Sequence, residues 1–356
     1  KVRKSSIFKT HLVKRKNSHK KTAANHMQNR CASYKKMNWI LQNTGLINHY
    51  NPNIHKGEQP IRVLHHMNLW MFQNTHPNFP NELSLAFDKN GLSKTIDVVY
   101  GENKVKGPFI KVQNKRIVLQ ETFLSYLWCI THSIYVIYVL KIEQPKINQK
   151  AGKEVYPKNE EDLNNAEELF EYAKSLISTY AKWDKESQPN PEIYLAQKRD
   201  LIEQPNCFYT EAVKFILCHE YTHGIKHLDV LNSGEEIELS GYIDFEKEAD
   251  SDAIDLMLKG VFPNKINELP IQIGITIGLL SMFFFKATTE NNIHPNTEDR
   301  LVDALEQMEL SDNHDVWGIA LVGLRLWDEQ FGLNFKWTIE KTDKEQFYHL
   351  IEQIKT

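Results

Sequence analysis

The feature that most constrains this chain is an apolar run that ends in two histidines four residues apart. Residues 215–223 read FILCHEYTH, which contains the pattern HExxH. On one continuous helix, His219 and His223 lie roughly 6 Å apart along the axis and about 40° apart around it, so both imidazoles can reach a single ion. We expect that ion to be zinc and the helix to begin at an N-cap at Thr210.

Glu220 directly follows the first of these histidines. Beside a zinc ion it would lie near the open coordination position, where its carboxylate can take a proton from a metal-bound water. This arrangement is typical of zinc peptidases. Because a chain with 15 histidines also shows the bare pattern by chance, the interpretation needs a second observation.

A second predicted helix, residues 244–257, carries the pattern ExxADxxA. Spacings of three and four residues place one set on a single stripe of this helix: Glu246, Ala249, Asp250, Ala253 and Met257. Two acids on a small, apolar stripe need partners, because an unpaired buried carboxylate is costly. Glu246 is therefore the predicted third zinc ligand, and Asp250 can accept the free N–H of a ligating histidine.

Other residues compete for these roles. Glu248 and Asp252 repeat the same spacing, but only the register of Glu246 places both alanines on the inward face. A solvated acidic helix without any ligand is the plain alternative. His227 would lie about 12 Å from the first histidine along a continuing helix, too far to share its ion. Asp229 takes the position of the last metzincin ligand, but the glycine of that motif is replaced here.

A third motif lies in residues 293–301, which read IHPNTEDRL. In this order, HEYTH, EKEADSDA and HPNTEDR resemble the motifs HExxH, ExxxD and HPxxxxR of gluzincin peptidases of the HtpX and CAAX-prenyl-protease kind. The resemblance covers residues 210–305. No set of multi-spanning membrane helices surrounds these motifs, which favours a soluble relative. The chain resembles the soluble phage-exclusion peptidases of the Lit type.

Carried over by position, the resemblance implies one zinc ion per chain and a role for each matching residue. His219, His223 and Glu246 would be the ligands, Glu220 the base, and Asp250 the residue that orients a ligand.

The third motif contributes His294 and Arg300. In such a site His294 would hydrogen-bond the oxyanion of the tetrahedral intermediate, and Arg300 would hold that loop in place. The alternative interpretation is a loop histidine before a proline and an arginine in the first turn of a helix.

Charge is unevenly distributed along the chain. Residues 1–37 contain twelve Lys or Arg and no Asp or Glu, so the remainder is acidic. We expect a flexible tail there, with nucleic-acid binding as an alternative role. A polar, proline-marked linker at 184–206 is expected to separate an α+β region, 38–183, from a helical zinc-metallopeptidase region, 207–356.

The predicted fold is α+β and mainly helical, with a zincin-like core. Residues 95–100 and 109–119 alternate as strands do, which predicts a small antiparallel sheet. The gluzincin resemblance implies that this sheet packs on the active-site helix and that its edge can pair with an extended substrate.

Two apolar segments, residues 123–140 and 271–285, approach membrane-spanning length. Polar interruptions within both favour buried helices of a large core, and a membrane hairpin is the alternative. Gly274 and Gly278 have the small-xxx-small spacing that allows close packing against another helix, in particular the zinc helix. The four cysteines form no CxxC pair. The early residues of the sequence show no apolar stretch of the kind found in signal peptides. These features favour a reducing cytoplasm.

The sequence therefore predicts a cytoplasmic zinc endopeptidase. The Lit-type resemblance implies that it hydrolyses an intracellular protein and has a role in antiphage defence. One alternative is a non-catalytic or toxin-like regulatory zinc protein that binds nucleic acid through residues 1–37. The intact Glu220 argues against it, because a structural zinc site needs no base. The other alternative is a membrane-embedded prenyl-protein protease, against which the polar interruptions argue.

Overall fold

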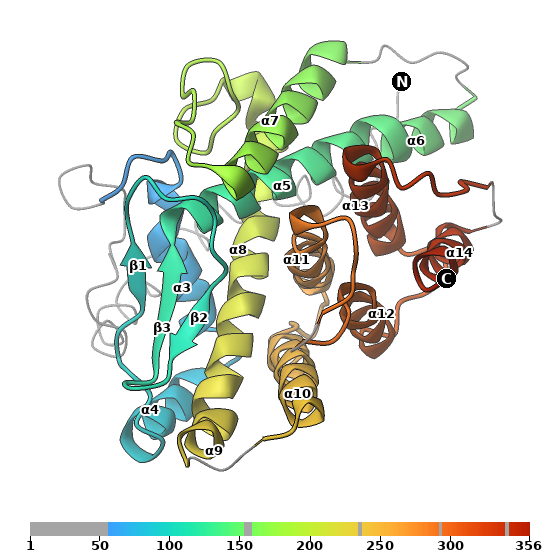
Figure 1. Cartoon of the computed structure of the whole chain (residues 1–356). Helices are drawn as coiled ribbons and strands as arrows, with labels where there is room; N and C mark the ends of the chain where they lie inside the picture. The colour runs from blue at the N-terminus through green and yellow to red at the C-terminus, as the bar shows by residue number, and fades with distance from the viewer. Residues whose placement is uncertain (1–55, 153–158, 234–236, 292–293, 339–341) are drawn as a thin grey trace.

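Long stretches of apolar residues at helical spacing give this chain a mainly helical structure with one small sheet (Figure 1). The computed structural model describes residues 56–152, 159–233, 237–291, 294–338 and 342–356. The basic tail predicted at residues 1–37 lies outside the described residues. The predicted α+β, mainly helical class is confirmed.

The three-stranded sheet lies at one edge of the molecule, beside α3, α4 and α8 (Figure 1). The strands are β1 (Asp97–Val99), β2 (Phe109–Lys111) and β3 (Arg116–Gln120). The helices are η1 (Arg62–Leu64), α3 (His65–Gln73), α4 (Phe79–Lys89), α5 (Glu121–Tyr138), η2 (Val139–Glu143), α6 (Gln144–Lys150), α7 (Glu160–Ser178), η3 (Ala196–Lys198), α8 (Arg199–Thr222), η4 (His223–His227), α9 (Leu228–Asn232), α10 (Leu239–Leu258), α11 (Glu268–Leu280), η5 (Phe283–Phe285), α12 (Thr297–Gln307), α13 (Asp315–Phe331) and α14 (Asp343–Ile354).

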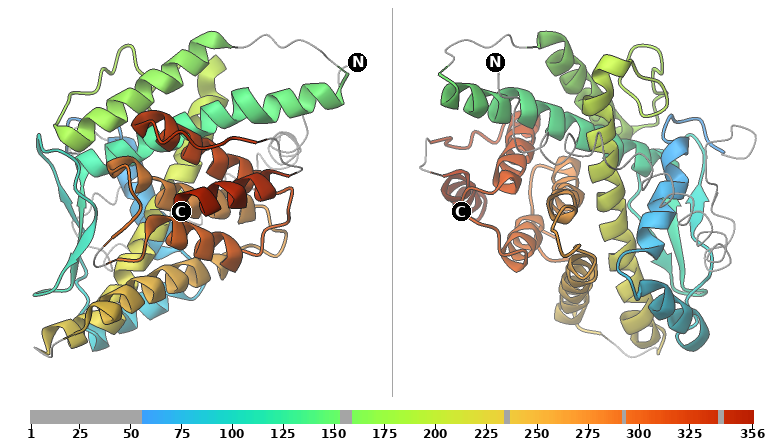
Figure 2. Two further views of the ribbon diagram at one scale, coloured as in Figure 1. Left: turned by 45° about the vertical axis from the view of Figure 1, so that its right-hand side comes forward. Right: turned by 180° about the vertical axis from the view of Figure 1, so that it is seen from behind.

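Helix α8 is the central element. It packs on α3, α5, α10 and α11. The right-hand view of Figure 2 shows α3 on one side of α8 and α10 and α11 on the other. Its apolar residues belong to one hydrophobic cluster that extends from Ile61 to Ile351. The helix that carries the HExxH histidines is therefore anchored in the core along most of its length.

The start of α8 differs from the prediction. The helix begins at Arg199, so a beginning at Thr210 is wrong, and the segment predicted as a linker at 184–206 overlaps its first turns. Pro205 reads as a helix breaker in the sequence, yet it is buried inside the helix. Packing on both sides of α8 offsets the hydrogen bond that this proline cannot donate.

The sheet is mixed rather than wholly antiparallel as predicted. Strand β3 lies between β1 and β2 and forms an antiparallel hairpin with β2. Strand β1, however, pairs with β3 in parallel, with Asp97 opposite Val118. Between β1 and β2 the chain crosses from one edge of the sheet to the other. Within this connection, the backbone N–H of Val105 donates to the carbonyl of Leu176 in α7.

Two helical stretches of the described residues are long and apolar enough to cross a membrane, Glu121–Lys150 and Glu268–Phe285. Of their most apolar windows, 89% and 72% are buried inside the protein. Length and composition alone are weak evidence of a span, because core helices of soluble proteins meet the same criteria. The burial predicted for both segments is found.

Helix α11 approaches α8 closely at its two glycines. A Cβ atom on Gly274 would lie 2.3 Å from Cβ of Glu211 and 2.9 Å from the backbone nitrogen of Ala212. At Gly278 the nearest atom would be a ring carbon of Phe215, at 3.2 Å. The predicted packing of both glycines against the helix that carries the histidines is confirmed.

This contact predicts that Gly274→Ala destabilises the protein by about 1–3 kcal/mol, because the added methyl group forces the two backbones apart. Gly278→Ala is the matched control, since the Phe215 ring can shift and alanine gains roughly 1 kcal/mol of helix propensity over glycine. Chemical denaturation of both variants measures the difference. Equal stability of Gly274→Ala and the wild type would contradict the close approach.

Candidate metal centre

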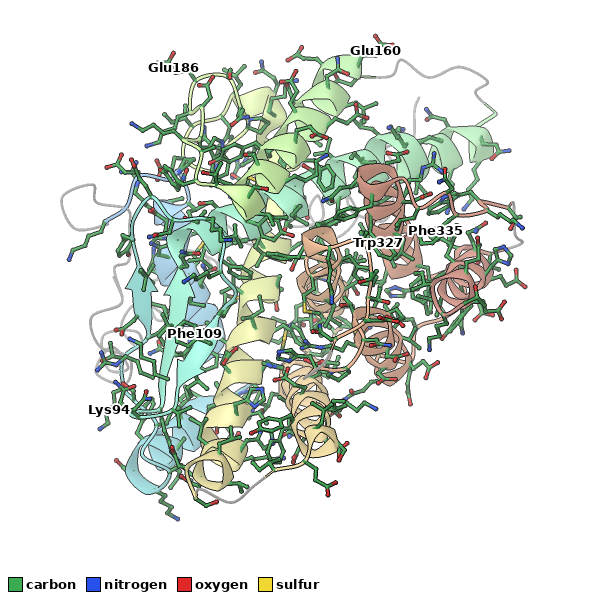
Figure 3. All side chains as sticks on the ribbon, in the orientation of Figure 1. Lys94, Phe109, Glu160, Glu186, Trp327 and Phe335 are labelled. Carbon is green, nitrogen blue, oxygen red and sulfur yellow. The ribbon has the colours of Figure 1, made fainter. Side chains whose placement is uncertain are left out.

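Two neighbouring helices supply the candidate site. His219 and Glu220 lie in the last turn of α8, and His223 begins the π-helical turn η4. Helix α10 packs beside α8 and presents Glu246 and Asp250 toward these residues. Figure 3 shows how side chains from these helices fill the space between them.

Three side chains converge on one point. Nε2 of His219 lies 3.1 Å from Nε2 of His223. Oε2 of Glu246 lies 3.5 Å from Nε2 of His219, and Oε1 of Glu246 lies 3.3 Å from Nε2 of His223. Zinc bonds of ~2.0–2.1 Å in a tetrahedron place ligand atoms roughly 3.3 Å apart. One ligand atom from each of the three side chains, all within 4.8 Å of one another, can approach this spacing and leave one position open.

The outer nitrogen of His219 is held by a buried ion pair. Nδ1 of His219 lies 2.8 Å from Oδ1 of Asp250. Arg300, in the first turn of α12, donates to both oxygens of the same carboxylate, from Nε at 2.6 Å and from Nη2 at 2.7 Å. Burial alone would raise the pKa of Asp250, but Arg300 and His219 lower it to about 2. The ionised Asp250 thus directs Nε2 of His219 toward the convergence point.

Arg300 acts on this carboxylate rather than on the loop that precedes α12. The sequence predicted that Arg300 holds that loop. Its guanidinium instead pairs with Asp250, and it also lies 3.8 Å from Oε2 of Glu246. A buried bidentate pair of this kind fixes geometry more strongly than a loop contact would.

Glu220 is buried beside the convergence point. Burial raises the pKa of its carboxyl to about 7, although the positive charge of His219 opposes this rise. A carboxylate whose pKa lies near the working pH suits a general base.

His294 approaches from the exposed side. Its Nδ1 lies 3.0 Å from Oε2 of Glu246, and its side chain is 39% exposed. The structure therefore brings His294 to the rim of the site, where a bound substrate can reach it.

The competing candidates point elsewhere. Glu248 and Asp252 both contact Nζ of Lys226, each at 2.6 Å, on the outer side of α10. Asp229 pairs with Lys115 at 2.6 Å, away from the histidines. None of these three acids belongs to the ligand group formed among the described residues.

One residue near the site was excluded by sequence reasoning. His227 was too far along the helix to bind the same ion, and it is not part of the ligand group. Its Nδ1 instead lies 2.9 Å from Nδ1 of His223, behind that ligand. The spacing of four residues between His223 and His227 was the sequence signal that could have predicted this contact.

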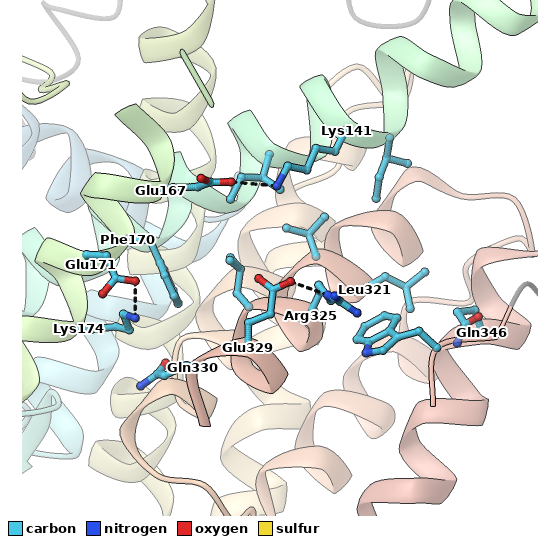
Figure 4. Close-up of a pocket in the computed structure, with 15 residues that line it drawn as sticks. Lys141, Glu167, Phe170, Glu171, Lys174, Leu321, Arg325, Glu329, Gln330 and Gln346 are labelled. Carbon is cyan, nitrogen blue, oxygen red and sulfur yellow. Dashed lines mark hydrogen bonds and ion pairs between the residues drawn. The ribbon is translucent and has the colours of Figure 1, made fainter. Parts of the chain in front are cut away.

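A cavity of about 810 Å³ lies at a different place, between α5, α7 and α13 (Figure 4). Its charged residues pair with one another, as in Lys141 with Glu167 and Arg325 with Glu329. No histidine or cysteine lines it. We place the candidate site at the histidines because the side chains that could hold a metal ion are there.

A comparison with known families bears on the same region. The family model for Peptidase U49 matches residues 117–320, which is more than half of the chain. The matched range includes every residue of the candidate site, from His219 to Arg300. No curated protein and no solved structure matches the chain.

The buried ion pair predicts that Asp250→Asn destabilises the metal-free protein by about 3–5 kcal/mol at pH 7, because it removes the carboxylate that pairs directly with the buried Arg300. Asp252→Asn, on an exposed pair, should cost no more than about 1 kcal/mol. The folded-state pKa of Asp250 lies below the unfolded value of 3.8, so its contribution is present above that value and is lost as pH falls toward 2.

Denaturation at pH 7 and at pH 3.5 measures both effects. The difference between the wild type and Asp250→Asn should narrow at the lower pH. Equal destabilisation by the two variants at pH 7 would contradict a special role for the pair of Asp250 and Arg300.

Proposed function

The chain belongs to the Peptidase U49 family, the Lit-type proteases, and on that premise we propose that it is a zinc-dependent endopeptidase. Membership supports a peptidase and, with it, a protein or peptide substrate. The proposed zinc ligands are His219, His223 and Glu246, with one ion per chain. The observation that carries the proposal is the convergence of their ligand atoms at 3.1–3.5 Å.

Ligand atoms this close repel one another unless a cation or a proton lies between them. Two imidazoles and a carboxylate with one position left open form the donor set of catalytic rather than structural zinc sites. Zinc bound there would polarise the scissile carbonyl and lower the pKa of a water molecule.

The chain's own residues supply the remaining steps. Glu220 accepts the proton of the attacking water and then gives it to the leaving amine, for which a pKa of about 7 is suitable. His294, at the exposed rim, is the proposed hydrogen-bond donor to the carbonyl oxygen as it gains negative charge. Asp250 and Arg300 keep His219 in place throughout.

An extended substrate can lie along the sheet. Strand β2 is an edge of the sheet, and its Ile110 side chain contacts Gly224, the residue after His223. A polypeptide that adds to this edge would therefore pass beside the ligands. We propose this edge as the substrate track.

We propose a cytoplasmic setting for the reaction. Of the described residues, Cys129, Cys207 and Cys218 are free cysteines, which is compatible with a reducing compartment. We propose that the substrate is a cytoplasmic protein and that its cleavage serves antiphage defence. The defence role rests on the resemblance to Lit-type peptidases.

Two variants separate the ligand role from the base role. Glu246→Gln should lose most of its zinc, because an amide is a poor replacement for an anionic ligand. Glu220→Gln should keep about one zinc per chain but lose activity by about 10²–10⁴-fold, because the proton acceptor is gone. Elemental analysis measures the metal, and mass spectrometry of a digested peptide library measures cleavage.

Asp252→Asn is the matched control, because Asp252 contacts Lys226 rather than the histidines, and it should resemble the wild type in zinc content. A wild type that carries no zinc after purification without chelators would overturn the proposed function. Full cleavage activity in Glu220→Gln would overturn the assignment of the base.

Zinc binding should also depend on pH. Burial lowers the pKa of His219, but hydrogen bonds to Asp250 and Glu246 outweigh burial and raise it to about 9. Below that pH the ligand is protonated in the metal-free protein and must release its proton to zinc. The apparent affinity should therefore rise by about tenfold per pH unit between roughly pH 7 and 9 and then level off.

Competition with a chromophoric chelator across this pH range measures the slope. Asp250→Asn removes the main partner of His219 and should flatten the slope near pH 8. A wild-type affinity that does not change with pH, after correction for the chelator, would contradict this linkage.

A further inference from the structure

We infer that His227 is a positioning residue for the second zinc ligand, His223, and that Glu248 anchors His227 in turn. The inference rests on the proposed zinc site and assigns two residues outside the ligand set to it. It identifies a support for His223 that parallels the pair of Asp250 and Arg300 behind His219.

A chain of short contacts carries the inference. Nδ1 of His223 lies 2.9 Å from Nδ1 of His227. On the other side of the same ring, Nε2 of His227 lies 3.1 Å from Oε2 of Glu248. The Nε2 atom of His223 remains directed toward Glu246 and His219.

Only one arrangement of protons satisfies all of these contacts when zinc is bound. A carboxylate accepts only, so Nε2 of His227 donates to Glu248. The neutral ring then has an unprotonated Nδ1, which accepts the N–H on Nδ1 of His223. That leaves the lone pair of Nε2 on His223 free for a metal ion. The tautomer of the ligand is thus set by the residue behind it.

The ring of His227 is held in one orientation by its surroundings. It is 2% exposed, and the ring of Phe245 stacks on it with centroids 4.5 Å apart and planes 13° apart. Both Phe245 and Glu248 belong to α10, the helix that also carries the third ligand. The contact therefore fixes the ligand turn η4 to α10 as well as orienting one imidazole.

The backbone explains how His227 reaches this position. The chain leaves α8 and forms the π-helical turn η4, which runs from His223 to His227. Such turns are wider than an α-helix and are frequent at functional sites. The two rings meet with centroids 5.0 Å apart. His227 is not a fourth ligand, because its two nitrogens face Glu248 and the outer side of His223.

The test compares three variants of the full chain by zinc affinity, measured by chelator competition. His227→Phe keeps an aromatic ring against Phe245 but removes the acceptor, and its affinity should fall by about 10–100-fold. His227→Asn places an amide oxygen near the position of Nδ1 and should recover most of this loss. Lys226→Met is the control, since it removes a partner of Glu248 without touching the histidines.

A spectroscopic measurement separates positioning from packing. With Co²⁺ in place of zinc, the visible absorption reports ligand geometry, and it should change in His227→Phe but not in Lys226→Met. Thermal unfolding of the metal-free variants shows whether each one folds. If His227→Phe does not fold, Glu248→Ala decides the matter, because loss of the anchor of His227 should lower the zinc affinity below that of Lys226→Met, and equal affinities would overturn the inference.

Wild-type affinity and an unchanged cobalt spectrum in His227→Phe would overturn the inference. An equal loss in His227→Asn and His227→Phe would overturn it as well, since packing rather than the hydrogen bond would then be the cause. These outcomes presuppose a wild type that binds zinc. Failure of the wild type itself to bind would overturn the proposed function together with the inference.

Discussion

The crowding of two imidazoles and a carboxylate at the junction of α8 and α10 is the constraint on which the rest of the site depends. Their ligand atoms lie 3.1–3.5 Å apart, a spacing that is unfavourable without positive charge between them. Such a group persists only if the two helices are held firmly together. The protein does this with a continuous apolar core around α8 and with polar contacts that join α8 and η4 to α10.

Those polar contacts form two supports of different chemistry. Behind His219, the ionised Asp250 is neutralised by the bidentate Arg300 from α12. Behind His223, the neutral ring of His227 accepts a hydrogen bond from His223 and donates one to Glu248 on α10. In the metal-free protein the positive charges of His219 and Arg300 oppose the rise in the pKa of Glu220 that burial causes.

Much of the site could be predicted because it depends on local periodicity. Spacings of four in HExxH and of three and four around Glu246 determine which side chains share a helix face. Features that depend on distant segments were missed or wrong. The parallel pairing of β1 depends on where the chain crosses the sheet, and the start of α8 depends on packing around Pro205. His227 had no predicted role because helical spacing places it too far from the ion, and that distance says nothing of its contact with the outer nitrogen of His223.

The most direct test of the zinc site is X-ray absorption at the zinc K edge on the purified wild type. The account predicts about four nitrogen or oxygen ligands at ~2.0–2.1 Å, with the outer-shell scattering of two imidazoles and no sulfur. An absence of zinc would contradict it. So would sulfur scattering at ~2.3 Å, because that distance belongs to cysteine ligands, which the described site does not contain.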